Sequence, residues 1–500
     1  MLENLFLGFS NVLSPTVLIG LTGGTIIGYL IGAMPGLGPS LGVALLIPFT
    51  YGVDPATAIV ALIALYVAAE YGGAVTAVVI NTPGTAAAVA TTWDGYPLAQ
   101  RGQAGAALNV SIIASGIGAL LAAVMLMFTA VPLSEFALRF GPTEYFALAL
   151  FGLSLVSSLS AGSLLKGLFA MFLGLTLVTI GVDPGTGIPR FAFSPELFEG
   201  LPLVPCLLGL YAISEVFYMI ETASERPVTS VRVQGLLAVP VRTYWEMKST
   251  ILKSSLIGYI IGVIPGAGAS IASMVAYSEA KRSSQDPDSF GKGNLHGIAA
   301  SESANNSAVP GALAPLLALG IPGSATAAIL IGALMIQGIE PGPLLFTRNP
   351  EIPYTIFASL IVSVPLMIFV GLAGAKLWAR VADVPKPLLA AVVAGISCIG
   401  AYASANSMFP VYVMLAMGAI GYALRKIEVP LAPIVLALVL GTIMETNFRR
   451  ALLTSNGDYM IFLRHPITLL LFAFAAVIML WPLVSRLRAT RCAPSKEASQ

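Results

Sequence analysis

Four Pro-Gly pairs interrupt apolar stretches of this sequence, and they are its most favourable positions for binding a small ligand. Proline removes a backbone N–H donor and glycine permits unusual turns, so a helix tends to end at such a pair. A helix that restarts there directs unpaired N–H groups and a positive dipole end toward the break, which favours a carboxylate. One such pair more often indicates a kink or close helix packing, but the four pairs here occur in two matched sets. The predicted substrate-binding breaks comprise Pro35, Gly36, Leu37, Gly38, Pro83, Gly84, Pro265, Gly266, Ala267, Gly268, Pro322 and Gly323.

Hydroxyl and amide side chains accompany the breaks. They can bind carboxylate oxygens or coordinate a cation without burying a charge. The alternative for each serine and threonine is a hydrogen bond to its own helix. The predicted binding set adds Ser40, Asn81, Thr82, Thr85, Ser270, Ser324 and Thr326.

Two acidic residues, Glu70 and Glu302, stand within apolar sequence, where an ionisable side chain indicates function by default. We assign them, with Asn305 and Asn306, to ion coupling or to a structural role such as capping a broken helix. An amide oxygen can ligate Na⁺, so Asn305 marks a potential sodium position, although no set of residues has a firm metal-ligand spacing. Na⁺ or H⁺ is the expected coupling ion, and no other cofactor is expected.

Composition identifies the chain as an integral membrane protein. Hydrophobic residues make up 57% of the 500 residues and charged residues only 10%, whereas soluble domains carry about 25%. The net charge of +1 provides no basic surface for nucleic acid. Apolar segments recur from Val17–Ala33 to Ile467–Val484, and the lengths needed to cross a bilayer predict about 11 to 14 membrane segments. The fold class is therefore an all-α polytopic membrane protein.

The chain contains an internal repeat. Gly28–Ser40 aligns without gaps on Gly258–Ser270, with eight of thirteen positions identical, and Asn81–Thr85 later matches Gly320–Ser324. We expect a first membrane repeat over 1–220, a polar cytoplasmic linker over 221–250, a second repeat over 251–485 and a basic cytoplasmic tail over 486–500. The lysine and arginine residues of the linker and tail place both in the cytoplasm. Broken helices or re-entrant hairpins from the halves should meet near the bilayer midplane; inverted repeats are favoured and parallel repeats are the alternative.

Other classes of function fit less well. An intramembrane hydrolase would need a nucleophile with a base, but His296 and His465 are the only histidines and no zinc-binding H-E-x-x-H occurs. We therefore predict no catalytic residues. An ion or anion channel is the stronger alternative because broken helices also line pores.

Longer motifs identify a family resemblance. The segments Phe290–Gly293, Gly297–Ser307 and Leu319–Ser324 resemble the signature region of the large permease subunit of tripartite tricarboxylate transporters. Asn81–Gly84, Asp94–Pro97, Gly102–Gly105 and Gly441–Arg450 do so as well. One departure is Ala74 after Tyr71–Gly73, where the family pattern has serine, so no hydroxyl ligand is expected there.

The resemblance implies a multi-pass permease of the bacterial inner membrane. It would work with a small membrane subunit and a periplasmic solute-binding protein, and it would import di- and tricarboxylates using an ion gradient. The resemblance leaves open whether several copies of the chain also assemble as a homo-oligomer. For the mechanism, we expect the broken helices of Gly28–Thr92 and Gly258–Ile336 to move against a framework of Ala104–Ile220 and Tyr354–Val484. An elevator-type displacement is preferred, with rocking about a fixed site as the alternative.

Overall fold

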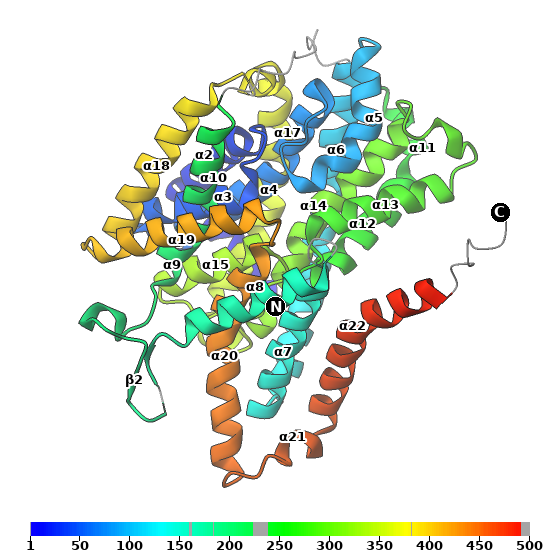
Figure 1. Cartoon of the computed structure of the whole chain (residues 1–500). Coiled ribbons are helices and arrows are strands. Elements are labelled where there is room, and N and C mark those ends of the chain that lie inside the picture. Colours follow the sequence, from blue (N-terminus) through cyan, green and yellow to red (C-terminus); the bar gives the residue numbers. More distant parts are fainter. Residues whose placement is uncertain (1, 160–162, 184, 224–238, 382, 492–500) are drawn as a thin grey trace, which may run out of the picture. The chain divides into compact units, whose positions relative to one another are not determined.

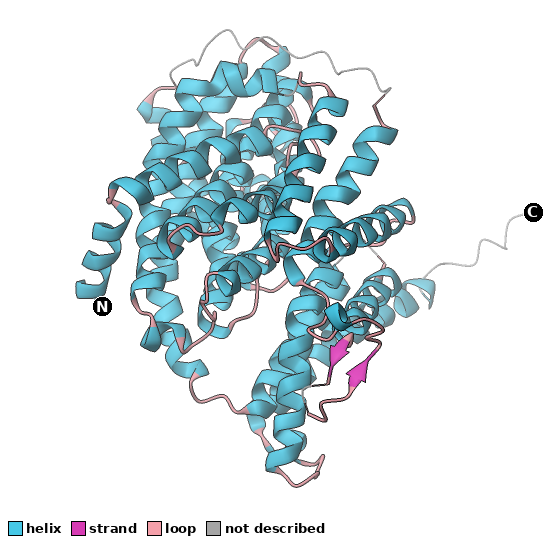
Figure 2. Cartoon of the chain, turned by 90° about the vertical axis from the view of Figure 1, so that its left-hand side faces the viewer, coloured by secondary structure: helices cyan, strands magenta, loops and turns pink. Residues whose placement is uncertain are grey.

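A computed structural model describes residues 2–159, 163–183, 185–223, 239–381 and 383–491. Nearly all of its regular structure is helical (Figures 1 and 2). The strands of the described residues are two short antiparallel segments, β1 (Gly181–Val182) and β2 (Pro189–Arg190). The all-α prediction is therefore confirmed.

Several helices are long and apolar enough to cross a membrane. Within the described residues seven meet this criterion, and four shorter apolar helices accompany them. Together they reach the lower end of the expected range of segments. The seven are Pro15–Gly32, Pro55–Ile80, Ala104–Ala137, Leu203–Glu221, Glu351–Val381, Lys386–Ala403 and Ala432–Thr454.

The chain forms two compact units, and the first comprises residues 1–138 and 202–423. It contains both sets of broken helices, so residues from the two repeats share one unit. Its helices are α1 (Leu2–Val12), α2 (Pro15–Gly32), α3 (Gly38–Leu46), η1 (Ile47–Thr50), α4 (Pro55–Ile80), η2 (Ala86–Ala88), α5 (Val89–Gln100), α6 (Ala104–Ala137), α9 (Leu203–Leu207), the π-helical η4 (Leu208–Ile213), α10 (Ser214–Glu221), α11 (Val241–Glu246), α12 (Lys248–Val263), α13 (Gly268–Arg282), η5 (Pro287–Ser289), α14 (Leu295–Leu319), α15 (Ala325–Ile336), α16 (Leu345–Arg348), α17 (Glu351–Val381), α18 (Lys386–Ala403) and most of α19 (Phe409–Lys426).

The second unit comprises residues 139–201 and 424–500. Besides the strand pair, it contains α7 (Pro142–Leu159), α8 (Leu164–Val178), η3 (Pro195–Leu197), α20 (Ala432–Thr454), α21 (Ile461–Arg464) and α22 (Pro466–Arg491). Within it, α20 packs against α7 and α8, and α22 packs against α7.

The central helices of the first unit begin and end at residues suited to those positions. The Asp54 side chain caps α4 by accepting from Thr57 N, and the Asn294 side chain caps α14 by accepting from His296 N. At their other ends, Asn81 (φ 54°) and Gly320 (φ 73°) adopt the left-handed conformation that terminates a helix. The sequence therefore sets both boundaries of each helix locally.

Glycines let equivalent helix pairs approach closely. A Cβ atom on Gly32 of α2 would lie 2.2 Å from Ala69 O of α4, and one on Gly262 of α12 would lie 2.5 Å from Ala308 O of α14. A side chain at either position would therefore force the helices apart. The repeated Gly-x-x-x-Gly spacing of α2 and α12 explains the contact, because small residues allow membrane helices to pack backbone to backbone.

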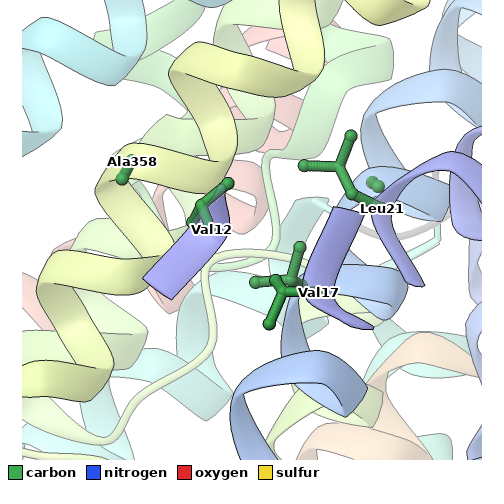
Figure 3. Packing of buried hydrophobic residues seen from close by; sticks show 6 residues of the cluster. Val12, Val17, Leu21 and Ala358 are labelled. Atoms are coloured by element: carbon green, nitrogen blue, oxygen red, sulfur yellow. The ribbon is translucent and has the colours of Figure 1, made fainter. Parts of the chain in front are cut away.

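An apolar cluster anchors the N-terminal helices to α17. Val12, Val17, Leu21, Val60, Ala64 and Ala358 are buried together, and Figure 3 labels Val12 of α1, Val17 and Leu21 of α2 and Ala358 of α17. This cluster fixes the start of the α2–α4 pair, so the pair reaches its breaks as a packed unit.

The observed division differs from the framework that the sequence suggested. α6 and α17 were expected to belong to a separate framework, yet they lie in the same compact unit as the broken helices. The physical reason is close packing: a Cβ atom on Gly118 of α6 would lie 2.3 Å from Ser303 O of α14. Residues 224–238 of the predicted linker and 492–500 of the predicted tail lie outside the described residues.

Candidate functional site at the helix breaks

The first break of each repeat is a tight turn between two helices. Pro35, Gly36 and Leu37 connect α2 to α3, which begins at Gly38, and Gly36 and Gly38 have φ values of 92° and 61°. The equivalent Gly266 and Gly268, between α12 and α13, have φ values of 80° and 61°. These left-handed conformations explain the two glycines of each motif. Pro265 and Ala267 complete the second turn.

The second break of each repeat follows the long central helix. Beyond α4, Gly84 N donates to Gly73 O at 3.2 Å; beyond α14, Gly323 N donates to Ala312 O at 3.3 Å. The same number of positions separates Gly84 from Gly323 and Gly73 from Ala312, so these backbone paths are equivalent. Each chain segment folds back on the helix it has left. The remaining predicted residues of these breaks are Asn81, Thr82, Pro83, Thr85, Pro322 and Ser324.

The central helices α4 and α14 run in opposite directions where they meet. Asn305 of α14 donates to Glu70 O of α4 at 3.2 Å, near the end of α4. Farther along α14, Leu313 and Leu317 line a small apolar cavity with Ile59, near the start of α4. Increasing residue number along one helix thus corresponds to decreasing number along the other.

Hydrogen bonds connect the breaks with one another. Ser40 Oγ lies 2.8 Å from Thr326 Oγ1, across the two repeats. Within the second repeat, Gly266 N donates to Gly323 O at 3.0 Å. These contacts bring three of the four predicted breaks together.

Other predicted residues do not join these contacts. The Thr82 hydroxyl donates to Ile80 O in its own segment, and Asn81 is exposed. Pro35 and Gly36 are exposed as well, whereas Ser270 is half-buried. At this position Ser273 makes the link between segments, donating to Ala87 O at 2.7 Å. The sequence pattern could not separate Ser270 from Ser273, because both follow the same break on one helix.

Glu302 is fully buried in a cluster of hydroxyl groups. Its Oε1 accepts a hydrogen bond from Thr91 Oγ1 of α5, and its Oε2 accepts one from Ser115 Oγ of α6 at 3.0 Å. The two oxygens of this side chain therefore tie α14 to α5 and α6. Glu70 is also buried, on α4. The two acids are not repeat equivalents, because the position matching Glu302 on α4 is Ile63.

Both asparagines after Glu302 use their amide nitrogens on α4. Asn305 Nδ2 donates to Glu70 O and Asn306 Nδ2 to Val67 O, each at 3.2 Å. Their Oδ1 atoms are buried and have no hydrogen-bond partner in the described structure. Buried amide oxygens of this kind can accept a hydrogen bond or coordinate a cation.

Asp94 was noted in the sequence only as part of the motif Asp94–Pro97, and the structure places it at the centre of a buried hydrogen-bond network. Its Oδ1 accepts from the backbone N–H groups of Gly291, Gly293 and Asn294, each at 2.8 Å. Its Oδ2 accepts from Tyr277 Oη at 2.8 Å. Asp94 follows the first-repeat break, and the loop precedes α14 of the second repeat. The Gly-Lys-Gly spacing was the available signal, since alternating glycines favour a loop whose N–H groups converge on an anion.

The second unit has a separate charged cluster outside the breaks. Arg449 of α20 forms two hydrogen bonds with Asp183, at 2.8 and 2.6 Å, and Arg190 pairs with Glu445 at 2.6 Å. The backbone N–H of Thr186, with help from the Arg449 guanidinium, lowers the pKa of Asp183 well below its usual range. Each charge has an opposite partner, so the cluster clamps the strand pair to α20. This explains Glu445 and Arg449 in the C-terminal motif.

Comparisons with known proteins identify a family and two relatives of this chain. The profile of the "Tripartite tricarboxylate transporter TctA family" matches residues 18–436, most of the chain. The "Uncharacterized 52.8 kDa protein in TAR-I ttuC' 3'region" of Agrobacterium vitis is 35% identical and covers 98% of both chains. The "Uncharacterized protein in TAR-II ttuC' 3'region" of the same organism is 36% identical over 47% of this chain and 97% of its own length. No solved structure matches. The length of the profile match and of the first relative's alignment shows that the chain belongs to the tripartite tricarboxylate transporter TctA family.

Proposed function

We propose that this chain is the large membrane subunit of an ion-gradient-driven importer of small di- or tricarboxylates. Membership of the TctA family supports transport and a tripartite assembly. The observation that carries the proposal is the hydrogen bond between Ser40 and Thr326, which joins breaks from the two repeats. Secondary transporters commonly place their substrate between repeats, at discontinuous helices.

The substrate would bind where the breaks present backbone N–H groups and hydroxyl side chains. α15 begins directly after Ser324, whose side chain accepts from Ala327 N, so the positive end of this helix faces the break. Ser40 and Thr326 offer two hydroxyl donors beside it. A carboxylate suits such donors without needing a buried cation.

The repeats are proposed to be inverted. The opposite directions of α4 and α14, set by the Asn305–Glu70 and Leu313–Ile59 contacts, support this arrangement. Inversion gives two equivalent half-sites that face opposite sides of a membrane, as alternating access requires. The breaks would then lie near the bilayer midplane.

The partners are proposed to be a small membrane subunit and a periplasmic binding protein that delivers the carboxylate. The location would be the bacterial inner membrane. Coupling to Na⁺ or H⁺ would involve Glu302, with Glu70, Asn305 and Asn306 beside it, because these are buried polar groups between the repeats.

The test of function is uptake by liposomes that contain this chain and both partner subunits. Concentrative, saturable uptake of a labelled di- or tricarboxylate under an imposed Na⁺ or H⁺ gradient is expected. Carboxylate flux that only follows its own gradient without saturation would support a channel. Absence of carboxylate flux with correctly assembled subunits and their matched binding protein would reject the proposal.

An elevator movement is the preferred mechanism, and single cysteines test it. They would be placed at Ser40 and Ser324 in a background without the native cysteines, with depth measured relative to Tyr145–Val182. A change of depth between inward- and outward-favouring conditions is expected. Constant depth with only a change in the accessible side would favour rocking.

A further inference from the structure

The two breaks after α4 and α14 provide an internal comparison of side chains. The equivalent hydrogen bonds Gly84–Gly73 and Gly323–Ala312 establish the correspondence. With the same spacing, Thr85 matches Ser324, and Asn305 of α14 matches Tyr66 of α4. Tyr66–Ser324 and, by this correspondence, Asn305–Thr85 each combine a residue of one central helix with a residue at the break of the other repeat.

One of these pairs is complete. Tyr66 Oη and Ser324 Oγ lie 2.9 Å apart and share a hydrogen bond in the buried interior. In the equivalent pair, Thr85 Oγ1 and Asn305 Oδ1 are both buried and have no hydrogen-bond partner in the described structure. Asparagine is much shorter than tyrosine, so it does not bridge to the opposite hydroxyl as Tyr66 does.

The orientation of the Asn305 amide follows from its surroundings. Its nitrogen donates to Glu70 O, and the reverse orientation would place two acceptor oxygens against each other. The amide oxygen is therefore the atom that remains to be satisfied. A buried acceptor without a partner costs about 1–3 kcal/mol, so two buried oxygens at the positions equivalent to the bonded Tyr66 and Ser324 favour a ligand that satisfies both.

The nearby charge determines the kind of ligand. Glu302 precedes Asn305 by three residues on α14, hence on the same face of the helix, and is fully buried. Its hydrogen bonds to Thr91 and Ser115 involve neutral groups. A second carboxylate would be repelled here, whereas a cation would be stabilised.

We propose that Na⁺ binds between Thr85 Oγ1 and Asn305 Oδ1, with the Glu302 carboxylate as the neighbouring negative charge. Hard oxygen ligands select alkali and alkaline-earth cations, and discontinuous helices in transporters coordinate Na⁺ with this chemistry. The unpartnered Asn306 Oδ1 lies next along the chain and is the third oxygen to test. This inference rests on the proposed ion-coupled transport and identifies its cation site.

The first test is Na⁺-dependent thermal unfolding of the purified full chain in detergent. Na⁺ should raise the unfolding temperature saturably, whereas K⁺ and N-methyl-D-glucamine at equal ionic strength should not, because a ligand that binds only the folded state stabilises it. Thr85→Val keeps the side-chain shape but removes the oxygen, and it should weaken Na⁺ affinity at least about tenfold, as should Asn305→Ala. Tyr66→Phe is the matched control, because it removes the equivalent hydroxyl at the other break and should leave Na⁺ affinity unchanged.

No Na⁺-specific stabilisation of the unsubstituted chain would overturn the inference even if a variant fails to fold. Wild-type Na⁺ affinity in Thr85→Val would overturn it as well. Carboxylate uptake by the assembled transporter under a proton gradient separates this inference from the proposed function. Persisting uptake without Na⁺ binding would reject only the sodium site, whereas Na⁺ binding without any carboxylate transport would reject the proposed function.

Discussion

The two breaks that follow the central helices share a backbone path but differ in their surroundings. Gly320, Pro322, Gly323 and Ser324 are buried, and Ser324 is bonded to Tyr66. In the equivalent segment, Asn81 is exposed, Thr82 and Pro83 are half-buried, and the Thr85 hydroxyl has no hydrogen-bond partner among the residues that the structure describes. The two segments thus share the glycine-dependent turn but differ in the side chains around it.

The divergence extends along the helices that follow the breaks. We name Asn81–Gln100 against α14 the first junction, and Gly320–Ile336 against α4 the second junction. At the first junction, Thr91 donates a hydrogen bond to Glu302. The equivalent residues at the second junction are Leu330 and Ile63, and both line an apolar cavity. The first junction is therefore the polar one. This difference suggests that ion chemistry belongs to one junction rather than to both.

The largest expected effect is on stability, at Asp94 of the first junction. Asp94→Ala would leave three backbone N–H groups and the Tyr277 hydroxyl without their acceptor. At roughly 1–3 kcal/mol for each unsatisfied group, the loss should reach several kcal/mol and lower the thermal unfolding temperature strongly. The control is Gln337→Ala, directly after the second junction, which removes one hydrogen bond to Thr50 O and should cost about 1 kcal/mol. Equal losses of unfolding free energy in the two variants would contradict the proposed difference between the two junctions.

A similar effect at both junctions is expected for the glycines of the turn. A Cβ atom on Gly84 would lie 2.0 Å from Gly32 O, and one on Gly323 would lie 2.6 Å from Gly262 O. Gly84→Ala and Gly323→Ala should each destabilise the folded chain by about 1–3 kcal/mol, because the contacting backbone must shift. Gly23→Ala is the control, since a Cβ atom there contacts nothing within 4 Å. Thermal unfolding of the three variants measures this, and an effect at only one junction would show that the turns are not equivalent.

Transport should depend on Glu302, because the equivalent position on α4 is the apolar Ile63. Glu302→Gln keeps the side-chain size but removes the charge, so concentrative uptake should fall at least about tenfold, equivalent to about 1.4 kcal/mol, while insertion and assembly persist. The matched variant is Ile63→Val at the equivalent position, which should cost about 0.5–1.5 kcal/mol in stability and leave uptake near the original rate. Unchanged uptake with unchanged ion dependence in Glu302→Gln would remove this residue from the site.

The smallest expected effect is a difference in stability between removing the Tyr66 hydroxyl, which is hydrogen-bonded, and removing the Thr85 hydroxyl, which is not bonded within the described structure. In Na⁺-free buffer, Thr85→Val should be neutral or slightly stabilising, because the buried oxygen it removes has no partner. Tyr66→Phe should cost about 1 kcal/mol, since it removes the hydrogen bond to Ser324. Thermal unfolding of both variants without Na⁺ gives the comparison. Destabilisation by Thr85→Val under these conditions would mean that its hydroxyl already has a partner.

Much of the fold could be predicted because its signals are local. The Pro-Gly pairs marked all four breaks, and the apolar segment Val17–Ala33 predicted a helix close to α2 (Pro15–Gly32). The helix ends at Asn81 and Gly320 follow from residues that tolerate positive φ. Such features need no knowledge of distant parts of the chain.

The site was predictable only in part, because its contacts join residues far apart in sequence. Glu302 was identified as an acid within apolar sequence, but its partners Thr91 and Ser115 lie about two hundred positions earlier, and no local signal pairs them with it. Asp94 was undervalued for the same reason, since its N–H partners follow nearly two hundred positions later.

The sequence by itself determined that the chain is a helical membrane protein with a duplicated pair of broken helices, since composition and Pro-Gly spacing act locally. The tertiary structure alone decided which hydroxyls pair across the repeats and which buried oxygens remain unpartnered. It also placed α6 and α17 with the broken helices rather than in a separate framework. The reason is physical: a hydrogen bond between side chains depends on distances of a few tenths of an ångström, and only the packing of whole helices fixes such distances.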